Sequence, residues 1–241
     1  MRYSNTITFL VSGRYALFSD PITRVGGEKC SYPVPTYQAL KGILESIYWK
    51  PTFVWVPTDV RILNRIETQS KGVRPICYNN GKNDLAIYTY LSDVAYQVRA
   101  HFEWNPHRPD LEQDRNENKH YAIAKRMLER GGRRDIFLGA RECQGYVEPC
   151  DFGEGPGAYD NTPSVPLGLM LHGLTYGNEN DLGVMQERFW YPTLENGVIH
   201  FCRPEECPVV RDIRSQKVPQ NFILNENLQS CDKLYQEVFS E

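Results

Sequence analysis

The chain lacks a long apolar run and any excess of positive charge. Its 241 residues contain no hydrophobic stretch of membrane-spanning length, and Met1 to Thr6 form no apolar signal-peptide core. The net charge is -3, whereas dedicated nucleic-acid binders are usually basic overall. A local basic groove can still attract a polyanion. We therefore expect a soluble, cytoplasmic protein without contact to a membrane.

Paired metal-binding cysteines are also missing. The seven cysteines are scattered, and no two of them form a Cys-x-x-Cys pair. Cys202 and Cys207 are close in sequence, but no second pair of ligands accompanies them, so we expect reduced thiols and no structural zinc. The chain has neither a Gly-x-x-x-x-Gly-Lys loop nor a His-Glu-x-x-His motif. We expect no metal and no cofactor.

Carboxylates alternate in a polar segment near the middle of the chain, at Asp110, Glu112, Asp114 and Glu117. They lack the ligand order of an EF-hand loop. The pattern predicts solvated charge.

The first part of the chain reads as an alternation of strands and helices. Hydrophobic periodicity predicts a strand at 7–11, a helix after Thr36, strands at 54–56 and 60–66, strands at 86–91 and 94–104 around a turn at Ser92-Asp93, a helix at 118–130 and a strand at 136–147. Asn118 is the expected N-cap and Gly131 the expected C′ residue of the second helix. The order is that of a ferredoxin-like βαββαβ domain, with 86–91 as an extra strand.

A glycine- and proline-rich run at 149–157 predicts a domain boundary. Beyond it, segments 167–176 and 182–191 flank a hairpin signal, 198–202 reads as a short strand, and 224–239 is at best weakly helical. We expect an α+β protein with a ferredoxin-like domain at 1–149 and a small antiparallel β-sheet domain at 150–241.

Lys119 and His120 stand side by side where a loop becomes a helix. Histidine exchanges protons near neutral pH, and lysine is a compact cation that suits a phosphate. Tyr48 is expected in the last turn of the first helix, where its phenol could orient a hydroxyl or share a proton. The alternatives are a solvated helix face for Lys119 and His120 and ordinary core packing for Tyr48.

Basic residues surround the end of the second helix, at Lys125, Arg126, Arg130, Arg133 and Arg134. They predict contact with a polyanion, although they could equally complement the helix dipole. A weaker basic pair, Arg24 and Lys29, lies in the first long loop.

Five runs of the sequence resemble one family. These are residues 13–18, 34–42, 116–121, 133–139 and 142–149. The chain resembles the CRISPR-associated RAMP-superfamily endoribonucleases of subtype I-C, the "five-d" Cas proteins, over nearly its whole length.

This resemblance implies a metal-independent ribonuclease that cuts precursor CRISPR RNA at the 3′ base of each repeat hairpin. Attack by a 2′-hydroxyl would leave a 2′,3′-cyclic phosphate and a 5′-hydroxyl. The implied partners are the repeat hairpin, the mature crRNA, whose 5′ handle stays bound, and the other subunits of a Cascade surveillance complex. The family's catalytic tyrosine, lysine and histidine fall on Tyr48, Lys119 and His120. The alternative is a non-catalytic RNA-binding subunit of such a complex, and the choice of general acid and general base stays open.

Overall fold

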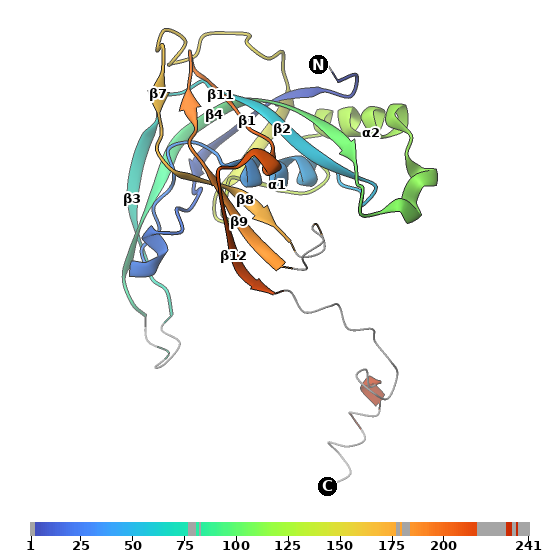
Figure 1. Cartoon of the computed structure of the whole chain (residues 1–241). Helices are drawn as coiled ribbons and strands as arrows, with labels where there is room; N and C mark the ends of the chain where they lie inside the picture. Colours follow the sequence, from blue (N-terminus) through green and yellow to red (C-terminus); the bar gives the residue numbers. More distant parts are fainter. Residues whose placement is uncertain are drawn as a thin grey trace.

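A computed structural model of the chain describes residues 3–76, 81, 83–176, 179, 184–215, 230–232 and 235. Its centre is a strongly twisted antiparallel sheet (Figure 1). The strands of this sheet are β1 (Ile7–Ala16), β2 (Phe53–Ile62), β3 (Glu67–Val73), β4 (Ala86–Trp104), β5 (Ile136–Phe137), β6 (Gln144–Pro149) and β11 (Val198–His200). Their order is β11-β2-β4-β1-β6-β5, and β3 pairs with β4 outside this path.

β4 runs without interruption for 19 residues, so the turn predicted at Ser92-Asp93 is wrong. Ser92 pairs with Tyr15 of β1 on one side and with Glu67 of β3 on the other. Backbone pairing with β1 and β3 therefore continues the strand past Ser92, and the next residue, Asp93, has a left-handed backbone with a φ of 51°. The tyrosine-rich 86–91 segment is therefore an extension of a central strand.

β2 is also continuous, although its sequence contains Pro57. The register against β4 shifts between Pro57 and Asp59, which marks a bulge. A proline lacks the N–H that a regular ladder needs, and a bulge is one of the places in a sheet that accept it. The sequence predicts separate strands at 54–56 and 60–66, whereas the structure has one strand with a bulge at Pro57.

Helix α1 (Tyr37–Ile47) begins where Thr36 caps it by accepting the N–H of Ala39. Its apolar face is buried through Tyr37, Leu40, Ile43, Leu44 and Ile47, and it contacts β2, β5, β8 and α2. This face agrees with the predicted helical spacing.

Helix α2 (Glu117–Glu129) starts earlier than expected, since its N-cap is Asn116 and not Asn118. The Asn116 side chain accepts the N–H of Lys119 at 3.0 Å. The helix ends as predicted at Gly131, whose φ is +81°, and the N–H of Gly132 bonds the Met127 carbonyl in a Schellman arrangement. The buried side of α2 consists of His120, Ala124 and Leu128.

The described residues also include the 3₁₀ helices η1 (Thr23–Gly26), η2 (Pro109–Asp114) and η3 (Pro204–Glu206). The η2 helix lies in the polar segment that carries the alternating carboxylates. It leads directly into α2 and therefore bears on the candidate site.

The rest of the chain adds β7 (Val165–Pro166) paired with β10 (Thr193–Leu194), and a sheet of β8 (Met170–Thr175), β9 (Val184–Trp190) and β12 (Val209–Ser215). The predicted hairpin is β8 and β9, which pair antiparallel. β12 was not predicted. Apart from residues 230–232 and 235, the weak helix expected at 224–239 lies outside the described residues.

The two parts of the chain share one apolar core. β11 joins the large sheet beside β2, and Met170, Trp190, Leu194 and Ile199 belong to the same buried cluster as Phe9 and Leu44. The division at residue 149 stays a prediction. Among the described residues, no helix combines the length and the apolar character that crossing a bilayer requires.

Candidate active site

Tyr48 and His120 meet, although 72 residues separate them in sequence. Their side chains approach with the Tyr48 hydroxyl 2.9 Å from Nδ1 of His120. Tyr48 is the C-cap of α1 rather than part of its last turn, with an extended backbone at φ -158° and ψ 127°. The indole N–H of Trp55 donates to the Tyr48 carbonyl at 2.7 Å, which fixes this extended residue against β2.

His120 lies in the first turn of α2 and is fully buried. Its Nε2 is 2.8 Å from the backbone carbonyl of Asp114. A carbonyl can only accept, so the network assigns the proton to Nε2 and leaves Nδ1 to accept from the Tyr48 hydroxyl. The rings of Phe53 and Trp104 enclose the imidazole, with centroids 5.3 and 6.0 Å away.

Asp114 connects His120 to Lys119. Its carboxylate pairs with the Lys119 ammonium, accepts the Thr52 hydroxyl at 2.7 Å and lies 3.4 Å from Nε2 of His120. The Lys119 ammonium, followed by the Thr52 hydroxyl, lowers the pKa of Asp114 to about 2. The prediction of solvated charge is therefore wrong for Asp114, because η2 folds it back onto α2.

The electrostatics favour a neutral phenol at Tyr48. Burial raises the pKa of Tyr48, and the negative charge of Asp114 acts in the same direction. Tyr48 therefore donates its proton to a lone pair on His120 at neutral pH. Such a pair can pass a proton from an external hydroxyl through the phenol to the imidazole.

Lys119 is the accessible member of the group. Its side chain is 46% exposed, whereas the His120 side chain is 0% exposed. Both ring nitrogens of His120 already have partners within the chain. A ligand can reach Lys119 directly, but it reaches the imidazole only through Tyr48 or after the η2 segment moves.

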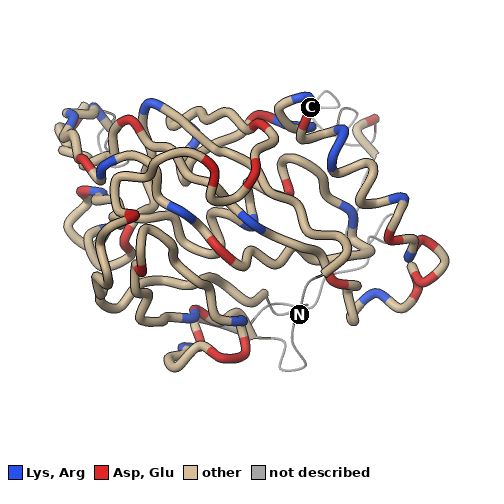
Figure 2. The backbone as a smooth tube through the Cα atoms, turned by 90° about the horizontal axis from the view of Figure 1, so that it is seen from above, with Lys and Arg blue, Asp and Glu red and all other residues tan. Residues whose placement is uncertain are grey.

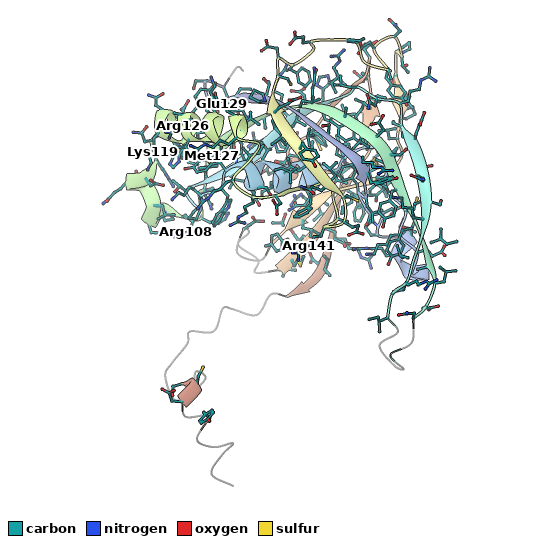
Figure 3. The ribbon with its side chains drawn as sticks, turned by 180° about the vertical axis from the view of Figure 1, so that it is seen from behind. Arg108, Lys119, Arg126, Met127, Glu129 and Arg141 are labelled. Atoms are coloured by element: carbon teal, nitrogen blue, oxygen red, sulfur yellow. The ribbon has the colours of Figure 1, made fainter. Side chains whose placement is uncertain are left out.

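The basic residues of α2 lie on its outer side. Lys125, Arg126 and Arg130 are exposed, and Figure 3 shows Lys119 and Arg126 projecting from the same helix. Seen from above, basic and acidic positions alternate around much of the backbone (Figure 2). The basic residues grouped on α2 therefore matter more for attracting a polyanion than the overall electrostatic field of the protein does.

The turn after α2 docks on the end of α1. The backbone N–H groups of Arg133 and Arg134 both donate to the Ser46 carbonyl, at 3.1 and 3.0 Å. This contact satisfies carbonyls at the C-terminus of α1 and brings the exposed Arg133 side chain close enough to Tyr48 to affect its pKa. The structure thus brings the basic turn to the candidate site.

Arg24 and Lys29 are elsewhere. Arg24 lies within η1 and Lys29 follows this helix, and the Lys29 ammonium lies 4.9 Å from the centroid of the Tyr88 ring on β4. This end of the β3–β4 ribbon is remote from α2 (Figure 1). The structure does not join this pair to Tyr48 and His120.

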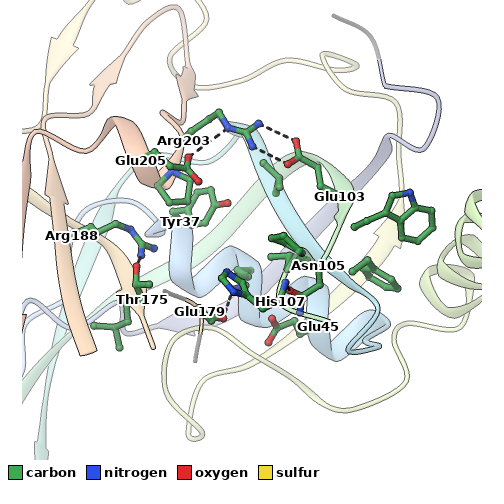
Figure 4. Close-up of a pocket in the computed structure, with 18 of the residues that line it drawn as sticks. Tyr37, Glu45, Glu103, Asn105, His107, Thr175, Glu179, Arg188, Arg203 and Glu205 are labelled. Carbon is green, nitrogen blue, oxygen red and sulfur yellow. Dashed lines mark hydrogen bonds and ion pairs between the residues drawn. The ribbon is translucent and has the colours of Figure 1, made fainter. Parts of the chain in front are cut away.

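A cavity of about 890 Å³ adjoins the candidate site. Phe53 and Trp104, whose rings enclose His120, also line this cavity. The opposite wall comes from β8, β9 and the η3 region (Figure 4), with Arg188 and Arg203 among its residues. Aromatic rings, arginines and glutamates therefore line one cavity beside the buried imidazole, and Arg203 is already paired with Glu103 there.

Comparison with known proteins assigns the family. The family model described as CRISPR-associated protein (Cas_Cas5) matches residues 6–202. A protein of Thermus thermophilus named CRISPR pre-crRNA endoribonuclease Cas5d is 34% identical over 176 residues, which are 69% of this chain and 72% of that protein. A protein of the same name from Mannheimia succiniciproducens is 26% identical over 230 residues, covering 81% of this chain and 94% of the relative.

Two solved structures agree with this assignment. A crystal structure of a CRISPR-associated protein has a TM-score of 0.73 and 38% identity, covering 86% of this chain and 96% of that one. The structure of a functionally uncharacterized protein from Streptococcus mutans, SMU1763c, has a TM-score of 0.72 and 41% identity, with the same coverage. The chain therefore belongs to the Cas5d family of CRISPR-associated proteins.

Proposed function

We propose that this chain is a metal-independent endoribonuclease that cuts precursor CRISPR RNA at the 3′ base of the repeat hairpin. The observation that carries the proposal is the 2.9 Å contact between the Tyr48 hydroxyl and His120, with Lys119 held beside them through Asp114. The names of the two curated relatives, both pre-crRNA endoribonucleases, support it.

The reaction uses the 2′-hydroxyl next to the scissile phosphate as the nucleophile. The 2′-hydroxyl gives its proton to the Tyr48 oxygen while the phenol proton moves to Nδ1 of His120. The resulting imidazolium then supplies a proton to the leaving 5′-oxygen, which balances the transfer. Lys119 stabilises the charge that develops on the phosphate oxygens, and the products are a 2′,3′-cyclic phosphate and a 5′-hydroxyl.

Access to this pair requires a local movement. The backbone carbonyl and the carboxylate of Asp114 cover Nε2 of His120, and Thr52 holds the same carboxylate. The RNA displaces the η2 segment when its phosphate replaces Asp114 as the partner of Lys119. Asp114 therefore acts as a positioning residue in the free protein.

RNA binding uses the basic side of α2 and the turn that follows it. The residues involved are Lys125, Arg126, Arg130, Arg133 and Arg134, with Arg24 and Lys29 as a separate, more distant contact. Hairpins are recognised mainly through shape and phosphates. The 890 Å³ cavity offers room for a nucleotide next to the cleavage site, between its aromatic rings and a wall that carries both arginines and glutamates.

Finer points of fold and assembly belong to the same proposal. The antiparallel order β2-β4-β1-β6, with α1 and α2 between the strands in sequence, supports a ferredoxin-like domain at 1–149. Residues 150–241 form the second, β-rich domain. After cutting, the cytoplasmic protein keeps the 5′ handle and serves as a subunit of a subtype I-C Cascade complex.

A non-catalytic RNA-binding subunit is the second candidate. The complete burial of His120, with both ring nitrogens bonded within the chain, favours it. A buried histidine whose two ring nitrogens are both hydrogen-bonded within the chain is also expected in a purely structural role.

The deciding experiment is cleavage of a labelled repeat hairpin by the full chain in EDTA. The wild type is expected to cut once, and His120→Ala is expected to bind the hairpin without cutting. His200 belongs to β11 and pairs with Asp59. The variant His200→Ala is the matched control and should cut the hairpin as the wild type does.

A substrate with a 2′-deoxy sugar at the cut site should resist cleavage. Cutting of this substrate would exclude attack by the 2′-hydroxyl, and undiminished cutting by His120→Ala would remove His120 from the mechanism. Tight hairpin binding by a wild type that cuts nothing would establish the second candidate instead.

A further inference from the structure

A buried group of possible metal ligands lies in the C-terminal half of the chain. His172 belongs to β8, Cys202 follows β11, and Cys207 follows η3. One ring nitrogen of His172 and the two sulfur atoms all lie within 4.8 Å of one another. His172 is 0% exposed and Cys207 is 8% exposed. None of the three residues belongs to the Tyr48–His120 site.

The distance between the two sulfurs fits a shared metal ion. The Sγ atoms of Cys202 and Cys207 are 3.9 Å apart. Two thiolates that each lie about 2.3 Å from a tetrahedral zinc ion are separated by about 3.8 Å, whereas the sulfurs of a disulfide are about 2.05 Å apart. The two side chains therefore already have the separation of neighbouring ligands in a tetrahedron.

His172 offers the third ligand, and its hydrogen bond indicates which ring nitrogen keeps a lone pair for a metal. Its Nε2 is 3.0 Å from the Cys202 carbonyl, which can only accept, so Nε2 carries the proton and Nδ1 keeps its lone pair. Nδ1 is buried and has no hydrogen-bond partner in the part of the chain that the structure describes. Zinc-bound histidines commonly donate their second ring N–H to such a carbonyl.

The imidazole is also fixed in place. It stacks on Tyr37 at 4.3 Å and meets the edge of Trp190 at 5.5 Å. A ring packed in this way cannot turn its unpaired nitrogen to water. A bound cation would give Nδ1 a partner, whereas a buried acceptor without one destabilises the fold.

We infer that His172, Cys202 and Cys207 bind a zinc ion through two thiolates and Nδ1, with a water molecule as the fourth ligand. Thiolate and imidazole together suit zinc among the common divalent cations. The ion would link β8, which packs on α1, to the η3 turn that leads into β12. It stabilises the C-terminal sheet and takes no part in RNA cleavage.

The test begins with the full-length wild type, purified with a reductant, dialysed against Zn²⁺ and then freed of excess metal. Elemental analysis should find one equivalent of zinc per chain. Co²⁺ in its place should give visible d–d bands and thiolate-to-metal charge-transfer bands. Cys207→Ser and His172→Asn should each weaken zinc binding by about tenfold or more. Cys30→Ser and His200→Asn are the matched controls and should bind as the wild type does.

A second measurement needs no variant, in case the substitutions prevent folding. Alkylation of the native chain, read by mass spectrometry, should spare Cys202 and Cys207 while zinc is bound and modify them after chelation. The inference is overturned if the zinc-dialysed wild type retains no metal, if zinc leaves the alkylation of both cysteines unchanged, or if the two form a disulfide under these conditions. Thermal stability should fall on chelation while hairpin cutting persists, which keeps this test separate from that of the nuclease.

Discussion

The contact between Tyr48 and His120 leads to a quantitative prediction, because two residues that act as one proton-transfer unit must show non-additive losses. Tyr48→Phe removes the hydroxyl that lies 2.9 Å from Nδ1 of His120. His120→Ala removes the imidazole itself. Positioned acid–base groups contribute about 10²–10⁴-fold to rate, so each single variant should cut more slowly by a factor in that range.

The double variant decides whether the two residues act together. If the phenol works only through the imidazole, Tyr48→Phe combined with His120→Ala should cut no more slowly than the worse single variant. If the two residues acted independently, their losses of cleavage rate would multiply, so that two losses of about 10²-fold would give about 10⁴-fold in the double variant. The assay is single-turnover cleavage of the labelled repeat hairpin in EDTA, with the rate constant measured at saturating protein.

Stability has to be measured alongside the rates. Tyr48→Phe costs one hydrogen bond of about 1 kcal/mol and leaves a buried imidazole nitrogen without a donor, for a total of about 2–4 kcal/mol. Urea unfolding shows whether the variants stay folded under assay conditions. Tyr32→Phe is the matched control, since the buried Tyr32 hydroxyl accepts the N–H of Leu171 on β8 at 3.2 Å. It should lose stability and keep its cutting rate.

Two results would refute the reasoning. Normal cutting by a folded Tyr48→Phe protein would reduce Tyr48 to core packing. Multiplying losses in the double variant would show that phenol and imidazole act on different steps.

Three further predictions concern charge and packing. Lys119→Ala should slow single-turnover cutting by about 10²–10³-fold while hairpin affinity, measured by filter binding, changes less than about tenfold. The Arg203 guanidinium lowers the pKa of Glu103 to about 2 from 4.5, so this pair stabilises the fold above about pH 4.5 and stops doing so as pH falls through about 2. Acid titration of the free energy of unfolding should show this loss, about 1 kcal/mol for so exposed a pair, and Glu103→Gln should abolish it. Gly139→Ala should destabilise the protein by at least about 3 kcal/mol in urea unfolding. The φ of Gly139 is +86°, and the new Cβ would lie 2.2 Å from a backbone carbonyl oxygen. Gly26→Ala is the control and should be neutral, because its new Cβ meets nothing within 4 Å.

The sequence predicted best those elements whose signals are local. The amphipathic spacing of α1, its cap at Thr36 and the glycine end of α2 depend on neighbouring residues, and all three are present. The β8–β9 hairpin is present for the same reason. Local signals suffice where residues within a few positions of one another decide the conformation.

The strands that the sequence did not predict form because neighbouring strands pair with them. β3, with the sequence ETQSKGV, has no alternation of buried apolar residues, because both its faces are largely exposed at the edge of the sheet. It forms because β4 offers it a full row of backbone partners from Ala86 to Ser92. The same pairing on both sides overrides the turn signal at Ser92-Asp93.

The candidate site was predictable in part. The resemblance to a family pointed to Tyr48, Lys119 and His120, and the fold brings the phenol and the imidazole together. Asp114 was missed because alternating carboxylates in a charged segment look solvated. The carboxylate contacts Lys119, Thr52 and His120 only because η2 packs against the start of α2.

The group of His172, Cys202 and Cys207 was missed for a related reason. A Cys-x₄-Cys spacing without a second pair carries a weak zinc signal, and His172 lies 30 residues upstream of Cys202. The third ligand comes from a different strand. Only the packing of β8 against the segment after β11 brings the three together.

The closed state of the site is consistent with catalysis because the side-chain contacts of Asp114 that close it are weak one by one. The Lys119–Asp114 pair is partly exposed and contributes about 0.2–1 kcal/mol, and the Thr52–Asp114 hydrogen bond contributes about 1 kcal/mol. An RNA phosphate that takes over Lys119 gains a charge-assisted contact of similar or greater strength. Release of η2 also breaks the hydrogen bond from Nε2 of His120 to the Asp114 carbonyl, so the exchange is balanced when the RNA accepts this N–H as well. The arrival of the RNA backbone is thereby coupled to the release of η2. Since the imidazole stays covered by Asp114 until then, the proton-transfer pair meets water only after a phosphate is in place.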